Sequence, residues 1–155
     1  MSEIILLEHR RPAGVGRYEW QPYAEDDNFT RHWWHRPWDL GNRYSLWSVR
    51  QDDIEVARIE LDQEVSYDHY KGVPNLGSQV LEIDFFEVSS AERGQGLGCS
   101  ALQLVAERFP GRRLVAFSEG ADRFWSGLGW TRYDHPRGFP AYRPFFVAPD
   151  GWPVR

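Results

Sequence analysis

The stretch VLEIDFFEVSSAERGQGLG, residues 80–98, constrains the fold of this chain more than any other. Residues 80–88 are almost all β-branched, aromatic or aliphatic, which predicts a buried strand. Residues 89–92 end that run, and glycines then lead into residues 99–108. Apolar side chains recur there at helical spacing, at Leu97, Ala101, Leu104 and Val105. The predicted order is strand, glycine loop and helix.

Gly94, Gly96 and Gly98 form a loop ahead of the predicted helix. Without Cβ atoms, several backbone N–H groups can point toward one anion, and the helix N-terminus adds its partial positive charge. A P-loop is excluded, because it needs a Lys after its last glycine and the only Lys here is Lys71. The dinucleotide fingerprint GxGxxG does not match either. What remains is an Arg-x-x-Gly-x-Gly phosphate loop that begins at Arg93.

A second motif lies downstream in residues 118–130, which read SEGADRFWSGLGW. Together, the two motifs resemble the GNAT superfamily of acyl-CoA-dependent N-acetyltransferases. That family has a pyrophosphate loop Gln/Arg-x-x-Gly-x-Gly/Ala and a later pattern Asn-x-x-Ala-x-x-Phe-Tyr-x-x-Leu-Gly-Phe. The resemblance covers roughly residues 80–147. It implies a single GNAT-like N-acetyltransferase domain over residues 1–155, and the chain length is that of one domain.

The resemblance also implies an α/β architecture, the GNAT fold, with a mixed central β-sheet of about six to seven strands flanked by helices. The residue pattern itself predicts strands at residues 3–8, 44–50, 54–61, 80–88, 112–117, 130–134 and 141–147. Residues 18–42 predict short helices and loops, residues 62–79 a long loop, and residues 121–128 a short helix. Because a helix joins residues 80–88 to residues 112–117, these two strands are expected to be parallel.

Two acids in the central strand are the candidate catalytic residues. Acetylation of an amine requires removal of a proton from an ammonium group, whose ordinary pKa is about 10.4. The resemblance places Glu82 where a branch of the family keeps a general-base Glu. Asp84 lies on the same face of the strand, and two neighbouring carboxylates raise one another's pKa. The alternative is that both acids point to solvent or pair with Arg.

The resemblance implies acetyl-CoA as co-substrate and no metal. Its pyrophosphate is expected to bind the backbone N–H groups of Arg93, Gly94, Gln95, Gly96, Leu97 and Gly98. The backbone at Phe86 and Val88 is expected to pair with pantetheine like an added strand. Ser118 stands where the family has a cofactor-contacting Asn. His32 and His35 are three residues apart, but no third metal ligand accompanies them.

The sequence departs from the family at the residue that often protonates the leaving thiolate. Trp125 stands where the family has Tyr, and an indole N–H donates a hydrogen bond but does not usefully deliver a proton. Tyr133, Tyr142 or water are the substitutes, or the thiolate leaves unaided. The implied function is direct transfer of acetyl from acetyl-CoA to a primary amine in a ternary complex. The missing Tyr keeps open a non-catalytic acyl-CoA-binding module with a regulatory or structural role.

Composition restricts the partners. The formal net charge of −5 does not favour nucleic acid as a general partner. No apolar run approaches the ~20 residues of a membrane span, and the lone Cys99 excludes an internal disulfide. We therefore expect a cytoplasmic protein without membrane partners, and a homodimer is left open.

The acceptor is a small-molecule or peptide amine that the sequence does not identify, and the acyl group is acetyl or larger. In the family, the region of residues 18–42 lines the acceptor side. Its aromatic and acidic residues suit a cationic amine, although packing onto the sheet explains the Trp residues as well. These residues are Trp33, Trp34, Trp38, Glu25, Asp26, Asp27 and Asp39.

Overall fold

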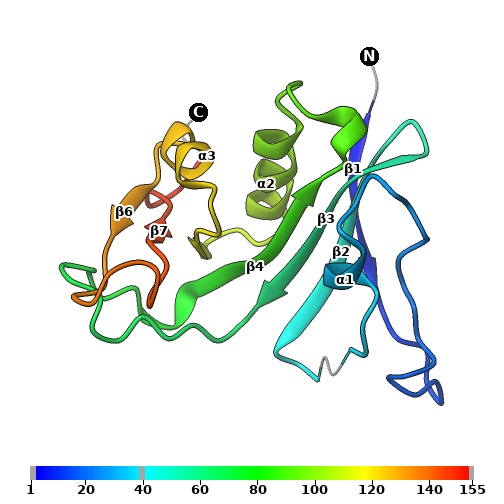
Figure 1. Cartoon of the computed structure of the whole chain (residues 1–155), viewed down its shortest axis with the longest axis horizontal. Helices are drawn as coiled ribbons and strands as arrows, with labels where there is room; N and C mark the ends of the chain where they lie inside the picture. The colour runs from blue at the N-terminus through cyan, green and yellow to red at the C-terminus, as the bar shows by residue number, and fades with distance from the viewer. Residues whose placement is uncertain (1–2, 39–40, 154–155) are drawn as a thin grey trace. The chain divides into compact units, whose positions relative to one another are not determined.

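The computed structural model describes residues 3–38 and 41–153. Within these residues, seven strands form one mixed sheet in the order β1-β2-β3-β4-β5-β7-β6 (Figure 1). The strands are β1 (Ile4–His9), β2 (Tyr44–Gln51), β3 (Ile54–Asp62), β4 (Val80–Val88), β5 (Arg113–Phe117), β6 (Thr131–Tyr133) and β7 (Phe145–Val147). The helices are α1 (Arg31–Trp34), α2 (Leu97–Arg108) and α3 (Asp122–Gly127), with single 3-10 turns η1 (Gly77–Gln79) and η2 (Ser90–Glu92). The expectation of a mixed sheet flanked by helices is confirmed.

The hairpin of β2 and β3 turns at Asp52 and Asp53. Both residues have positive φ, 53° and 65°, which is the backbone of the two-residue turn that matches the twist of paired strands. Asp tolerates this left-handed conformation better than most residues with a Cβ. Both strands extend one residue further than predicted, β2 to Gln51 and β3 to Asp62.

The parallel pairing of β4 with β5 is also confirmed, from Val80 opposite Arg113 to Glu82 opposite Val115. Helix α2 joins the two strands, as a parallel connection requires. Its buried side chains are Leu97, Ala101, Leu102 and Val105. Leu104, which the sequence analysis noted for its helical spacing, is half-buried. At about 100° per residue, the buried face is centred further toward Leu102, so that Leu104 lies at its edge.

The terminal pair of strands is shorter than predicted. β6 and β7 are antiparallel, with Thr131 opposite Val147 and Tyr133 opposite Phe145. β7 also pairs antiparallel with β5 and therefore lies between β5 and β6. The predicted bounds were too long because the segment between β6 and β7 contains Pro136, Pro140 and Pro144, which donate no backbone hydrogen bond to a ladder.

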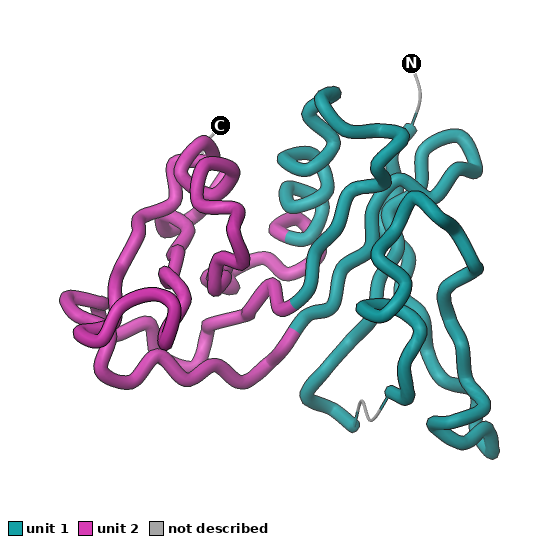
Figure 2. The backbone as a smooth tube through the Cα atoms, in the orientation of Figure 1, with its two compact units in different colours: residues 1–61, 85–105 teal, residues 62–84, 106–155 magenta. Residues whose placement is uncertain are grey.

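The chain divides into two compact units, Met1–Leu61 with Phe85–Val105 and Asp62–Asp84 with Ala106–Arg155 (Figure 2). Each unit has its own hydrophobic cluster. The first is formed by Tyr23, Phe29, Trp34, Trp38 and Leu46, and the second by Leu76, Val80, Val115, Phe145 and Val147. β4 supplies residues to both units. The expectation that residues 1–155 fold as a single domain stays a prediction.

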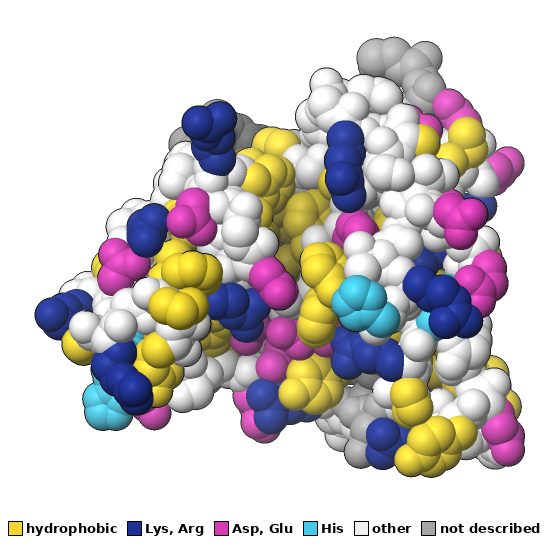
Figure 3. Space-filling model, viewed as in Figure 1, with side chains coloured by type: hydrophobic (Ala, Val, Ile, Leu, Met, Phe, Trp, Pro, Cys, Tyr) yellow, Lys and Arg dark blue, Asp and Glu magenta, His cyan; other side chains and the backbone are white. Residues whose placement is uncertain are grey.

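In the Trp-rich region of residues 18–42, the described residues 18–38 and 41–42 form loops and the single turn of α1, as predicted. Trp34 and Trp38 are fully or almost fully buried in the first cluster, and Trp33 packs against it. Packing therefore accounts for these side chains. Asp39 lies outside the described residues. On the face shown in Figure 3, both basic and acidic side chains are exposed on each unit.

Candidate active site

Glu82 is the most perturbed acid of the second unit. It follows two buried residues of β4, and its side chain is itself buried, with 7% exposed. Burial, the charges of Asp84 and Asp62, and a hydrogen bond with Asp84 together raise the pKa of Glu82 to about 8. Arg143 acts in the opposite direction. The structure thus brings both predicted catalytic acids together at a protonatable site.

Asp62 is a third carboxylate of this site, and the sequence analysis missed it. It is the last residue of β3, with 4% of its surface exposed, and its Oδ1 accepts the N–H of Glu64 at 2.9 Å. The predicted strand ended at Leu61, which assigned Asp62 to the following loop. A prediction that β3 and β4 are neighbours in the sheet could have identified Asp62 as part of this site. We call Asp62, Glu82 and Asp84 the carboxylate cluster.

Glu87 lies on the opposite face of β4 and belongs to the first unit. Its carboxylate accepts the backbone N–H of Thr30 at 2.8 Å, the hydroxyl of Thr30 at 2.7 Å and the indole N–H of Trp34 at 2.8 Å. Arg93 forms an ion pair with it at 3.7 Å and donates from Nε to the carbonyl of Val88 at 3.3 Å. Glu87 is therefore a buried acid with donors on several sides.

The glycine loop of the first unit lies directly before α2 and has two glycines with positive φ. Gly94 and Gly96 have φ of 82° and 77°, which favour glycine, and a Cβ at either position would meet no atom within 4 Å. α2 begins directly after the loop, with the N–H of Ser100 donating to the carbonyl of Gly96 at 3.2 Å. The first N–H groups of such a helix have no partner within it. Phosphate binding at this loop stays a prediction.

The remaining predicted cofactor residues differ in exposure. Leu97 is buried at the start of α2, Phe86 and Val88 are half-buried on β4, and Gln95 donates to Glu92 at 3.3 Å. Ser118 of the second unit is buried and forms hydrogen bonds with backbone groups of that unit. Its N–H donates to the carbonyl of Pro144 at 2.8 Å, and its hydroxyl accepts the N–H of Ala121 at 3.1 Å.

Trp125 is a buried residue of α3, packed against Trp130 at 5.0 Å between ring centroids and against Phe124 at the same distance. Its surroundings in the second unit are thus aromatic. Of the two alternative acids, Tyr142 stacks on His135 at 3.5 Å, and Tyr133 packs against the second hydrophobic cluster.

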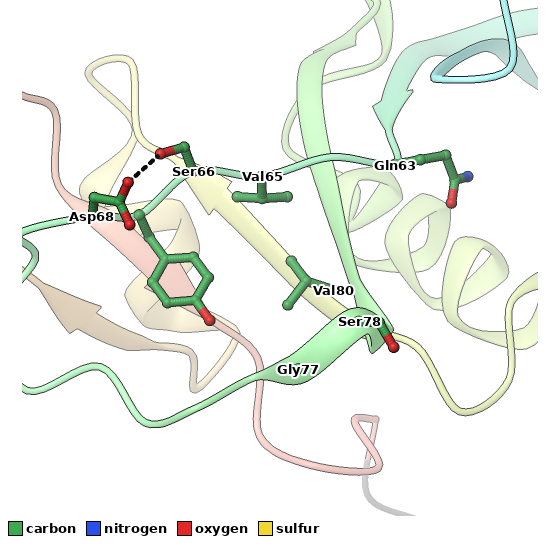
Figure 4. A pocket seen from close by; sticks show the side chains of 8 residues that line it. Gln63, Val65, Ser66, Asp68, Gly77, Ser78 and Val80 are labelled. Atoms are coloured by element: carbon green, nitrogen blue, oxygen red, sulfur yellow. Dashed lines mark hydrogen bonds between the residues drawn. The ribbon is translucent and has the colours of Figure 1, made fainter.

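A cavity of about 370 Å³ also lies in the second unit (Figure 4). It is lined by Gln63, Val65, Ser66, Tyr67, Asp68, Gly77, Ser78 and Val80. Most of these residues belong to the loop of residues 62–79, in which the sequence identified no functional residue. Among residues 3–38 and 41–153, no group of three or more His, Cys, Asp or Glu side chains is placed to hold a metal ion. Within the same ranges, no helix has the length and apolar character needed to cross a membrane.

No protein-family model and no curated protein sequence matches this chain. Solved structures do. A protein of Desulfovibrio desulfuricans assigned to the GNAT family as an acetyltransferase matches with a TM-score of 0.55 and 15% identity, over 94% of this chain and 96% of that one. The chain has the GNAT fold. The resemblance drawn from the two sequence motifs is confirmed at this level.

Two further solved structures support the assignment. An acetyltransferase of Thermus thermophilus matches with a TM-score of 0.54 and 16% identity, over 72% of this chain and 67% of that one. A GNAT family acetyltransferase of Elizabethkingia anophelis, with acetyl-CoA bound, matches with a TM-score of 0.50 and 14% identity, over 93% and 95% of the two chains. At such identities, the likeness establishes the GNAT fold and leaves the activity to be argued from the site.

Proposed function

We propose that this protein is an N-acetyltransferase that moves acetyl from acetyl-CoA to a primary amine by direct attack in a ternary complex. The observation that carries the proposal is Glu82, a buried carboxyl group whose pKa is raised to about 8. Such a group is suited to accept a proton near neutral pH, which is uncommon for a carboxylate. The GNAT fold and the acetyl-CoA bound to the Elizabethkingia protein support the choice of donor.

The donor would supply an acetyl thioester, which is an activated carbonyl. The proposed phosphate contacts are the backbone N–H groups of residues 93–98, because this loop lies at the N-terminus of α2 and Gly94 and Gly96 have positive φ. Phe86 and Val88 of β4 are the proposed backbone partners of pantetheine, and Ser118 is a proposed further contact. These assignments follow the family motif residue by residue.

Glu82 is proposed as the general base and Asp84 as its partner. Glu82 takes a proton from the ammonium of the acceptor, directly or through water. The freed nitrogen lone pair forms a C–N bond to the acetyl carbon, the C–S bond breaks, and its electron pair stays on sulfur as a thiolate. Asp84 and Asp62 hold the proton affinity of Glu82 high, so that it competes with the amine for the proton.

The second candidate function is a non-catalytic module that binds acyl-CoA. The observation that favours it is Trp125, which is buried among aromatic rings where the family often has a proton-donating Tyr. An assay of CoA thiol release with and without an added amine distinguishes the two functions. Release of free CoA thiol that depends on an added amine supports the enzyme, whereas binding of acetyl-CoA without such release supports the module.

The decisive variant is Glu82→Gln, measured by thiol release with acetyl-CoA and an amine library. We expect kcat to fall by roughly 10²- to 10⁴-fold, the range for loss of a general base. In the wild type, kcat/KM should rise with pH and level off above about 8, since the base must be deprotonated. The remaining activity of Glu82→Gln should keep rising at high pH, where the acceptor loses its proton unaided.

Two controls accompany this measurement. Asp84→Asn tests the rival acid on the same face, and Asp150→Asn changes an exposed carboxylate of the same unit and should leave kcat unaltered. A wild-type kcat and an unchanged pH profile in Glu82→Gln would remove Glu82 from the mechanism. A large loss in Asp84→Asn would then transfer the role to Asp84.

A further inference from the structure

The cavity of the second unit is a candidate binding site for the acceptor amine. Its volume of about 370 Å³ falls in the range of small-ligand sites, roughly 300–1,000 Å³. Its wall is held in place by Tyr67, whose ring stacks on Phe145 at 5.5 Å and whose hydroxyl accepts the N–H of Leu76 at 3.3 Å. The cavity is therefore a formed feature of the loop of residues 62–79.

Two residues that line the cavity are close in sequence to residues of the carboxylate cluster. Val80 lines the cavity and is on the same face of β4 as Glu82, two residues further on, which is about 7 Å along a strand. Gln63 lines it too, and directly follows Asp62. Glu82 does not itself line the cavity, and it stands next to the lining residue Val80 on that face of β4.

The polar groups of the lining differ from one end to the other. Figure 4 shows Ser66 and Asp68 at one side and Gln63 at the opposite side, with Val80 between them. Ser66 donates to Asp68 at 3.4 Å. Of the eight lining residues, Asp68 alone is charged, and none is Lys, Arg or His. A carboxylate on the ligand would therefore meet only negative charge and neutral dipoles, whereas a cation would be attracted.

We propose that this cavity holds the acceptor of the acetyl transfer and selects a small diamine, with one nitrogen toward Glu82 and the other toward Asp68. The inference rests on the proposed function, because Glu82 is taken as the base. It assigns the acceptor site to the loop of residues 62–79 rather than to the Trp-rich region of residues 18–42, where Trp34 and Trp38 are buried in packing. It also predicts that amines with a free carboxylate are poorer acceptors than diamines.

Three amines of equal chain length test the proposal by thiol release with the wild-type protein. They are butane-1,4-diamine, butan-1-amine and 4-aminobutanoate, which differ only in the far group. We expect kcat/KM to be highest for the diamine and lowest for 4-aminobutanoate. The value for butan-1-amine should be about two- to fivefold below that for the diamine, which is the contribution expected of an exposed ion pair. The preference for the diamine should shrink in high salt, because exposed charges are screened.

The variants Asp68→Asn and Asp68→Lys test the residue. Asp68→Asn should remove the preference for the diamine over butan-1-amine, and Asp68→Lys should favour 4-aminobutanoate instead. The matched control is Asp134→Asn, an exposed carboxylate of the same unit that does not line the cavity and should keep the wild-type order. An unchanged order of amines in both Asp68 variants would overturn the inference while leaving the transferase proposal intact.

Binding without turnover separates the two proposals further. Titration with butane-1,4-diamine should shift the backbone amide resonances of residues 63–68 and 77–80 in the wild type and less so in Asp68→Asn. Shifts confined to other residues would overturn the inference. If no amine is acetylated although acetyl-CoA binds, the proposed function fails and the acceptor assignment fails with it.

Discussion

At the scale of single residues, Glu82 shows how position changes the chemistry of a carboxyl group. Its ordinary pKa is 4.5, and burial together with the charges of Asp84 and Asp62 raises it to about 8. The folded protein therefore binds a proton at Glu82 more tightly than the unfolded chain does. By linkage, this site favours folding below its ordinary pKa and loses that contribution as the pH rises through about 8.

The free energy of unfolding should therefore fall between about pH 4.5 and pH 8 through Glu82, by about 1.4 kcal/mol for each tenfold difference in proton affinity. Glu82→Gln has no proton to lose, so its unfolding free energy should fall less over this window and exceed that of the wild type at pH 9. Urea unfolding at pH 5, 7 and 9 measures both proteins. Parallel pH dependences would show that Glu82 keeps an ordinary pKa.

At the scale of elements, Glu87 holds α1 against β4. α1 has four residues, and a helix of one turn does not stabilise itself. The side chain of its N-cap, Thr30, makes no capping hydrogen bond within the helix. Instead, Glu87 accepts from the backbone and hydroxyl of Thr30 and from the indole of Trp34. A carboxylate on the strand thus supplies what the helix lacks.

Glu87→Gln should lower the free energy of unfolding by about 1–3 kcal/mol, because the amide offers one acceptor oxygen and leaves a buried donor unpaired. Glu19→Gln is the control, an exposed acid of the same unit that should change stability by less than about 0.5 kcal/mol. Urea unfolding followed by Trp fluorescence measures both. Equal stabilities would mean that packing of Trp34 alone holds α1.

These two acids also show what a sequence can predict. β4 was predicted with its observed bounds, Val80–Val88, because a long apolar run is a local signal. The short α1 was not located, since its partner Glu87 lies 57 residues away from Thr30 along the chain. The mutual effect of Glu82 and Asp84 followed from spacing. The contribution of Asp62 did not, because it depends on which strands become neighbours.

At the scale of the whole molecule, the proposed tasks are divided between the two units. The glycine loop proposed to bind phosphate belongs to the first unit, and the carboxylate cluster and the cavity belong to the second. Binding of acetyl-CoA can therefore be tested without reference to the base.

Acetyl-CoA should raise the free energy of unfolding by about 2.7 kcal/mol at a concentration one hundred times its Kd. Gly96→Glu places a carboxylate in the proposed phosphate site and should abolish this stabilisation. Gly111→Glu is the matched control, since Gly111 also has positive φ and open space around its Cβ position but lies after α2. Thermal unfolding and calorimetry measure both. Equal binding by Gly96→Glu and the wild type would place the phosphates elsewhere.

The proton on Glu82 also changes how the molecule meets a charged ligand. The formal net charge of −5 counts every Asp and Glu as ionised, so one neutral carboxyl at pH 7 makes it −5 + 1 = −4. A cation arriving beside Glu82 favours the ionised form and expels this proton into the solvent. The heat of such binding would then depend on the ionisation enthalpy of the buffer, and the affinity would increase with pH.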